Sequence, residues 1–251
     1  MDNAGALESF LSDFASIEHA KILVHGGGKL ATELSAKLGI TTQMIDGRRI
    51  TDADTLQVVT MTYAGWVNKT IVAKLQSKNC NAIGLSGADA KLFLAIKRAV
   101  KDIDYGFVGD LNSVNVNVAF LSNLFANKAT PVIAPISSDS NGQLLNVNAD
   151  TVARTIAEAM ARDFEVKLIY CFEKNGLLSD VNNDSSVITE INFETAEQLK
   201  NKGVITSGML PKIDNALGAI NNGVKEVIIG HAKNILQIAK GENGFGTRIY
   251  Q

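Results

Sequence analysis

Apolar residues show two different patterns along the chain: helical spacing and short continuous runs. Leu7, Phe10, Leu11 and Phe14 recur at helical spacing, which predicts an amphipathic helix. Short apolar runs without alternation, such as KILV at 21–24, are typical of strands buried on both faces. The same reasoning predicts strands at 81–85, 131–136, 167–172, 226–230 and 247–250, and a β-like patch at about 93–108.

Turn and cap signals separate the helices from these strands. Leu30, Leu34 and Leu38 continue a helical pattern that Gly39 ends. An Asp-Gly pair at 46–47 lies between short β-prone runs and predicts a hairpin. The stretch 51–54 resembles a capping box that opens a helix reaching about residue 77. Further helices are expected at 116–126, 150–162, 193–202, 211–221 and 232–239.

Strands that alternate with helices indicate crossover connections and a mostly parallel sheet. The fold class is therefore α/β, a three-layer αβα sandwich with helices on both faces of the sheet. We expect one continuous sheet and a soft lobe boundary, giving an N-terminal lobe at 1–162 and a C-terminal lobe at 163–251.

Composition and charge narrow the class of protein. The 251 residues are 46% hydrophobic with a formal net charge of −2, which is an ordinary globular composition. Near-zero charge favours no nucleic-acid or anionic-membrane partner, and no apolar stretch is long enough to span a bilayer. Cys80 and Cys171 lie in or beside apolar runs and are expected to be reduced core thiols. A cytoplasmic protein is the prediction.

Three consecutive glycines, Gly26 to Gly28, come shortly after the apolar run at 21–24 and precede a helix. Glycine lets a ligand approach backbone N–H groups, and the start of a helix favours an anion. A strand-to-helix turn that needs a positive φ is the structural alternative, but one glycine would satisfy it. The triplet therefore favours an anion-binding turn.

The stretch LNVNAD places Asn146, Asn148 and Asp150 at alternate positions. In extended chain this spacing turns all three side chains to one side, and asparagine suits a ligand that carries an amide. The alternative is N-cap and Asx-turn duty before the helix at 150–162.

Two basic residues are candidates for holding anionic groups. Lys212 lies in the first turn of a helix, where a cation opposes the helix dipole, so helix stability does not explain it. Arg49, beyond the hairpin, has the geometry to fork onto a carboxylate, whereas Arg48 would face the other way in a strand. A surface lysine and a solvated hairpin tip are the alternatives.

Taken together, these motifs resemble the amino acid kinase family, and within it the acetylglutamate kinase branch. The matching stretches occur in the family's order across the whole chain: VHGGG (24–28), GRRITDADTLQVV (47–59), NKTIVAKL (68–75), LNVNADTVA (145–153), NGLLSD (175–180), GVITSGMLPKIDNAL (203–217) and GTRI (246–249). The resemblance implies ATP-dependent phosphorylation of the γ-carboxylate of N-acetyl-L-glutamate or N-succinyl-L-glutamate, the second step of arginine biosynthesis. It also implies an acylglutamate-binding, dimerising N-terminal lobe and an ATP-binding C-terminal lobe.

The resemblance assigns substrate contacts to five residues of the expected N-terminal lobe. Gly27 and Gly28 match backbone amides around the γ-carboxylate and the transferring phosphoryl group. Arg49 matches the arginine on the α-carboxylate, and Asn146 and Asn148 match the acylglutamate-binding asparagines.

The same resemblance assigns catalytic and nucleotide roles. Lys212 matches a lysine on the ATP phosphates, and Asp150 matches the aspartate that positions catalytic lysines. Nucleotide contacts are implied for Glu173, Gly176, Leu177, Leu178, Val204, Ile205 and Thr206. Mg²⁺ is expected to be held mainly by phosphates and water, without a dedicated carboxylate cage. The resemblance further implies a homodimer.

The family opens with a strand that carries a Lys-x-Gly-Gly motif before the first helix. The sequence begins at Met1, about where that strand would end. We expect that a product with about fifteen more residues carries the lysine, and that the chain as given has low activity and low stability.

Two alternatives use some of the same residues. A serine hydrolase would use HGGG as an oxyanion loop and Ser86 in GLSGA as nucleophile, followed by Asp180 and His231. Ala88 stands where that motif requires glycine, and LNVNAD and Lys212 stay unexplained. The second alternative is a non-catalytic, kinase-like protein that binds the ligand without turnover.

Overall fold

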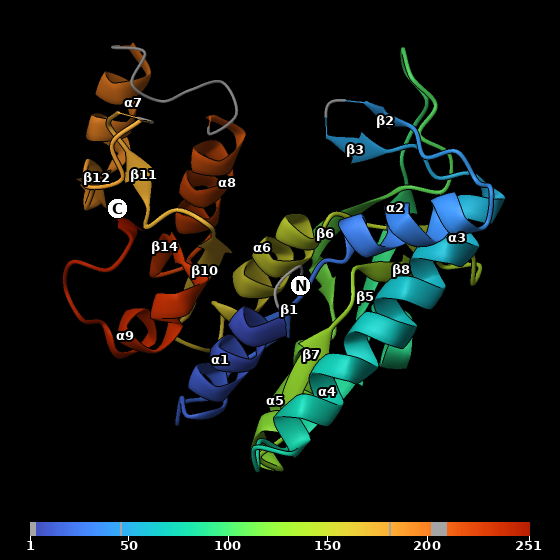
Figure 1. Ribbon diagram of the computed structural model, residues 1–251, viewed down its shortest axis with the longest axis horizontal. Coiled ribbons are helices and arrows are strands. Elements are labelled where there is room, and N and C mark those ends of the chain that lie inside the picture. The colour runs from blue at the N-terminus through green and yellow to red at the C-terminus, as the bar shows by residue number, and fades with distance from the viewer. Residues whose placement is uncertain (1–3, 46, 181, 202–209) are drawn as a thin grey trace. The chain divides into compact units, whose positions relative to one another are not determined.

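The structure is a computed structural model that describes residues 4–45, 47–180, 182–201 and 210–251. Two compact units are present (Figure 1). One unit is Glu18–Thr155, and the other is Ile156–Gln251 together with the amphipathic helix α1, Ala4–Ala15. Leu11 and Phe14 of α1 are buried, as the helical spacing predicted. The functional division into lobes at 162/163 stays a prediction.

The first unit contains a parallel sheet of three strands in the order β1–β7–β4: Leu23–Val24, Thr130–Ile133 and Ala82–Leu85. Helix α4, Asn68–Gln76, packs against β4 and β7, and helix α5, Val118–Ala126, packs against β7. The expected strand at 21–24 is shorter than predicted, because only two of its residues pair and both are half-buried.

A second sheet of the first unit has the order β6–β5–β8–β9: Gly109–Val116, Phe93–Lys97, Ile136–Ser138 and Leu144–Asn146. The expected single strand at 131–136 is divided here, because the chain leaves β7 after Ile133 and enters β8 at Ile136. The described strands thus form separate sheets, so the expectation of one continuous sheet was wrong.

The long helix expected at 51–77 is present but is not uniform. It consists of α3 (Ala53–Thr60), the π-helix η1 (Met61–Val67) and α4. The cap is Asp52, whose carboxylate accepts the Thr55 amide proton at 2.8 Å, rather than Thr51. The π segment was not predicted; such segments recur at functional sites.

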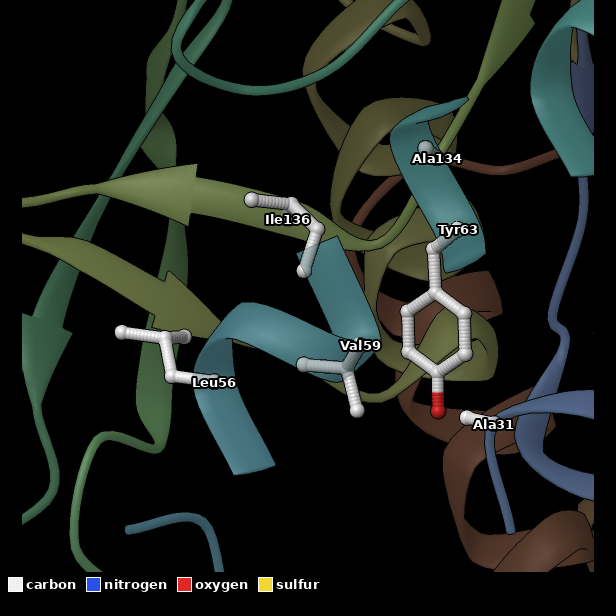
Figure 2. Packing of buried hydrophobic residues seen from close by; sticks show 6 residues of the cluster. All are labelled: Ala31, Leu56, Val59, Tyr63, Ala134 and Ile136. Atoms are coloured by element: carbon white, nitrogen blue, oxygen red, sulfur yellow. The ribbon is translucent and has the colours of Figure 1, made fainter. Parts of the chain in front are cut away.

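This helix packs on helix α2, Gly28–Lys37, through a cluster of buried side chains (Figure 2). Ala31 of α2 meets Tyr63 of η1 in that cluster, and the Tyr63 ring reaches from its helix toward α2. The remaining members are Leu56, Val59, Ala134 and Ile136. The cluster fixes where α2 begins relative to the long helix.

The first unit is completed by the hairpin of β2 (Met44–Ile45) and β3 (Arg48–Arg49), with Gly47 at φ +72 between them. Helix α6, Ala149–Met160, follows β9. The hairpin prediction is confirmed.

The second unit is built on a sheet in the order β10–β14–β15–β13: Lys167–Phe172, Glu226–His231, Thr247–Ile249 and Glu190–Ile191. Besides α1, its helices include α7, α8 and α9: Phe193–Asn201, Leu210–Asn221 and Ile235–Lys240. A small ladder pairs β11 (Leu177–Leu178) with β12 (Val187–Ile188). The predicted strands are confirmed, whereas β11, β12 and β13 were not predicted.

Parallel ladders β1–β7–β4 and β10–β14 with intervening helices confirm the α/β class. Both cysteines are free thiols, as expected, but only Cys80 is buried; Cys171 is exposed, so the expectation of a core thiol was wrong there. Across the described residues, no helix has the length and apolar character needed to cross a membrane.

Candidate active site

The glycine turn lies at the carboxyl end of β1. The amide of His25 extends the β1–β7 ladder by donating to the Ile133 carbonyl at 3.1 Å, and α2 starts at Gly28 with Gly27 as its N-cap. A glycine cap has no side chain to accept the first-turn N–H groups, so these donors remain available to an anion.

The three glycines differ in why the chain has glycine at each position. None of them has a φ in the left-handed region, so the explanation that the turn requires a positive φ was wrong. A Cβ on Gly27 would lie 2.8 Å from Tyr63 Cδ1, which is too close, whereas a Cβ on Gly26 would meet nothing within 4 Å. Packing of the chain therefore explains only Gly27, and the openness at Gly26 and Gly28 favours an approaching ligand.

Arg49 is a buried cation aimed at this turn. Only 7% of it is exposed, and its Nη2 donates to the Gly28 carbonyl at 2.9 Å and to Thr32 Oγ1 at 2.8 Å. Its Nη1 donates to Thr42 Oγ1 at 3.1 Å. The alternative of a solvated hairpin tip was wrong for Arg49, while Arg48 is exposed as the strand alternation predicted.

Tyr63 lies beside Arg49 and the glycine turn. It was not selected as a site residue from the sequence. Burial raises the pKa of Tyr63, and the charge of Arg49 together with a hydrogen bond from it opposes that rise. The phenol is therefore a neutral group beside the guanidinium. The signal in the sequence was weak, because Tyr63 occupies an ordinary position on a helix face.

The asparagines of LNVNAD differ in their surroundings. Asn146 ends β9, is buried, and donates through Nδ2 to Thr51 Oγ1 at 3.0 Å. Asn148 is exposed, and its Oδ1 accepts the Thr151 amide proton at 3.0 Å. Asn148 thus acts as an N-cap through its Oδ1, which was the structural alternative.

Asp150 does not lie in extended chain. It belongs to the first turn of α6, so the expectation that residues 146, 148 and 150 share one side of a strand was wrong. The strand ends at Asn146 because the cap at Asn148 starts the helix at Ala149.

In the second unit, Lys212 lies on α8 with its Nζ 3.5 Å from the centroid of the Phe172 ring. Phe172 is the last residue of β10, and a cation over an aromatic face is attracted to it. Glu173 follows at the carboxyl end of that strand, and its charge raises the pKa of His231 against the larger lowering by burial and by Lys233. The geometry thus brings Lys212 to the end of β10.

Two of the expected nucleotide-contact residues after β10, Gly176 and Leu177, pack against or hydrogen-bond to Thr247. A Cβ on Gly176 would lie 2.7 Å from Thr247 Oγ1, and the Leu177 amide donates to that same hydroxyl at 2.7 Å. Leu177 is buried and Leu178 is half-buried. The other three expected contacts, Val204, Ile205 and Thr206, lie outside the described residues.

The hydrolase alternative finds no support in the local geometry. Ser86 is buried and its hydroxyl donates to Asp89 Oδ2 at 2.8 Å, with its amide on the same oxygen at 2.6 Å. His231 Nδ1 accepts the Lys233 amide proton at 3.1 Å. Both groups serve as local turn and cap partners.

No cluster of three or more histidine, cysteine or acidic residues suited to a metal ion occurs in the part of the chain that the structure describes. The donors that converge at the glycine turn are amides, hydroxyls and a guanidinium, which bind anions rather than cations.

Comparisons with known proteins agree with this geometry. The model of the amino acid kinase family matches residues 1–231. An acetylglutamate kinase from Cytophaga hutchinsonii is 54% identical over 250 residues, covering 99% of this chain and 94% of the relative. An acetylglutamate kinase from Methanopyrus kandleri is 37% identical over 231 residues, covering 90% and 92%.

Solved structures share the fold. N-acetylglutamate synthase from Neisseria gonorrhoeae, complexed with coenzyme A and N-acetyl-glutamate, superposes with a TM-score of 0.83 at 21% identity. The match covers 99% of this chain but only 57% of that longer protein. Carbamate kinase from Giardia lamblia gives a TM-score of 0.67 at 14% identity, covering 98% and 89%. With the family model spanning most of its length and a relative at 54% identity, the chain belongs to the amino acid kinase family.

Proposed function

We propose that this chain is an ATP-dependent kinase that phosphorylates the γ-carboxylate of N-acetyl-L-glutamate, the second step of arginine biosynthesis. The observation that carries the proposal is the 54% identity to an acetylglutamate kinase over 99% of the chain. Neither the hydrolase nor the non-catalytic alternative is favoured, because neither accounts for that identity.

The reaction joins two anions, and the residues suit that task. A carboxylate is ionised at pH 7, so its attack on a phosphoryl group needs no general base. Backbone amides of Gly27 and Gly28 would receive the γ-carboxylate and the transferring phosphoryl group. Oriented donors of this kind act without reorganising during the reaction, which is how they lower the barrier.

Arg49 is proposed to hold the substrate α-carboxylate. Its burial and its three hydrogen-bond partners fix the guanidinium in one orientation, so little side-chain entropy is lost when a carboxylate binds. Asn146 and Asn148 are proposed to bind the acylamide group, since asparagine supplies both a donor and an acceptor.

Lys212 is proposed to bind the ATP phosphates and to stabilise negative charge in the transition state. Asp150 is proposed to have the family's role of positioning catalytic lysines. Glu173, Gly176, Leu177 and Leu178, together with Val204, Ile205 and Thr206, are proposed to form the nucleotide site. Mg²⁺ would supply charge neutralisation on the phosphates while keeping most of its own water, because the described residues offer no carboxylate cluster to hold it.

The direct test is trapping of the acyl phosphate with hydroxylamine, using ATP and either N-acetylglutamate or N-succinylglutamate. Lys212→Met should abolish turnover. The matched control is Lys225→Met, since Lys225 is an exposed lysine of the same unit that pairs with Glu165 at 2.7 Å. Full hydroxamate formation by Lys212→Met would contradict the assignment of Lys212, and no product from the unmodified chain with either substrate would contradict the proposed function.

Two finer expectations belong to this proposal. The protein is proposed to act in the cytoplasm as a homodimer, and light scattering on the purified protein tests the oligomeric state. A ratio of kcat/KM values for acetyl and succinyl substrates decides which acyl group the site prefers.

A further inference from the structure

His25, which precedes the glycine turn, is buried and hydrogen-bonded through both ring nitrogens. It is 7% exposed. Nδ1 lies 2.8 Å from the carbonyl oxygen of Gly26, and Nε2 lies 3.1 Å from Nδ2 of Asn68 on α4. The proposed function gives His25 no part, although it links the turn to the long helix.

The surroundings of Asn68 determine where the His25 proton sits. The Asn68 Nδ2 also donates to the Val132 carbonyl at 2.9 Å, and its Oδ1 accepts from Lys69 Nζ at 3.2 Å. The amide is therefore oriented with its NH₂ group toward the ring, so Nε2 must be the acceptor. Nδ1 then carries the proton and donates it to the Gly26 carbonyl. Burial lowers the pKa of His25, which keeps this neutral form.

A hydrogen bond to the Gly26 carbonyl determines the direction of the next N–H group, that of Gly27. In a trans peptide the C=O of one residue and the N–H of the next point in opposite directions. Holding the Gly26 oxygen on the His25 side therefore turns the Gly27 N–H to the other side. The neighbouring carbonyls are also held, because Gly27 O accepts the Ala31 amide proton at 2.9 Å and Gly28 O accepts from Arg49.

We propose that His25 is a positioning residue, whose neutral ring, oriented by Asn68, fixes the Gly26–Gly27 peptide so that the Gly27 N–H is aimed at the reacting anion. This inference rests on the proposed function for the identity of that anion. His25 itself touches neither substrate nor phosphate. A purely structural histidine would contribute to folding but would leave the turnover of the folded enzyme unchanged.

Two substitutions separate the two ring nitrogens. His25→Asn places an amide NH₂ where Nδ1 lies and keeps a donor for the Gly26 carbonyl, whereas His25→Gln places its amide near Nε2 and keeps only the Asn68 contact. Ser137→Ala is the matched control, because Ser137 is fully buried in the same unit and donates to the Phe93 carbonyl at 2.6 Å, away from the turn. All three remove a buried hydrogen bond.

Loss of one oriented oxyanion donor costs about 10²- to 10³-fold in kcat, and a misdirected donor costs part of that. We expect His25→Gln to lower kcat by about tenfold or more, with the KM for ATP unchanged. The kcat of His25→Asn should lie within about threefold of that of the unmodified enzyme. The kcat of Ser137→Ala should equal that of the unmodified enzyme. Wild-type turnover in His25→Gln, or equal losses in the Asn and Gln variants, would overturn the proposal.

A second measurement keeps this test separate from the proposed function. In protein labelled with ¹⁵N-glycine, the Gly27 amide resonance should move in His25→Gln and return toward its original position in His25→Asn. If the unmodified chain forms no acyl phosphate, the proposed function fails, and this resonance alone decides the positioning role. An unmoved Gly27 resonance in His25→Gln would then overturn it.

Discussion

A methyl group added at Gly28 or at Gly27 distinguishes a ligand-binding turn from one that serves packing alone. A Cβ at Gly28 would lie 4.0 Å from Arg49 Nη2 and from the Tyr63 hydroxyl, which is ordinary contact. A Cβ at Gly27 would lie 2.8 Å from Tyr63 Cδ1, and this ring is buried in the cluster of Figure 2. The two variants therefore differ in what the folded chain itself tolerates.

The magnitudes follow from those distances. Gly28→Ala should leave the free energy of unfolding unchanged or raise it by up to about 1 kcal/mol, because Gly28 begins α2 and alanine is the better helix former. Gly27→Ala overpacks a filled site, which costs about 1–3 kcal/mol. For a chain of this size, that cost lowers the melting temperature by roughly 2–12 °C.

Activity should fall in Gly28→Ala even though stability does not. The Gly28 methyl would stand beside Arg49, where the substrate carboxylate is proposed to bind. The same 1–3 kcal/mol of crowding, now against the ligand, lowers kcat/KM by about 5- to 160-fold. Melting curves and hydroxamate assays on both variants measure the two effects. Wild-type kcat/KM in a stable Gly28→Ala variant would refute the assignment of this turn to the substrate.

Three further substitutions or conditions test the surroundings of the turn. Arg49→Lys should raise the KM for N-acetylglutamate by about 10- to 150-fold, since lysine loses the fork worth about 1.5–3 kcal/mol; an unchanged KM would place the α-carboxylate elsewhere. Gly84→Ala should lower kcat as strongly as Asn68→Ala does, because the new Cβ would lie 2.0 Å from the buried Asn68 Oδ1, and normal kcat in a folded Gly84→Ala variant would exclude this coupling. Burial lowers the pKa of His25 in the folded state, so unfolding takes up a proton below the unfolded value of about 6.5. Urea titrations should show stability falling between pH 7.5 and 5.5, less steeply in His25→Asn; His231, whose pKa is lowered too, contributes equally to both, so identical slopes would argue against a neutral buried His25.

Elements whose signal is contained in consecutive residues could be predicted from the sequence. The apolar run KLIYCF became β10, Lys167–Phe172, and the helical spacing around Phe10 became α1. In both cases burial of one apolar segment determines the element. By contrast, β6 consists of GDLNSVNV, which is rich in asparagine and largely exposed. Its pairing with β5 maintains it, and that long-range pairing leaves no local pattern.

The candidate site shows the same division between local and distant causes. The glycine triplet and Arg49 could be proposed from the sequence because each has an unusual residue type in an informative position. Asp150 was assigned to the wrong geometry because the cap at Asn148 competes with strand extension, and spacing alone does not decide that competition. Tyr63 was not selected as a site residue, because its place beside Gly27 depends on a π-helix.

The glycine turn itself explains why a motif of bare backbone depends on residues far from it. Its three carbonyls are held by three different parts of the unit: by His25, which follows β1, by the first turn of α2, and by Arg49 of the hairpin. Each bond fixes one peptide plane, and the N–H groups then face away from these partners. The backbone donors of an anion site must be fixed before the ligand arrives, since reorganising them during the reaction would raise the barrier. The motif supplies the donors and the separate partners orient them, so the anion-binding role proposed for HGGG depends on the first unit as a whole.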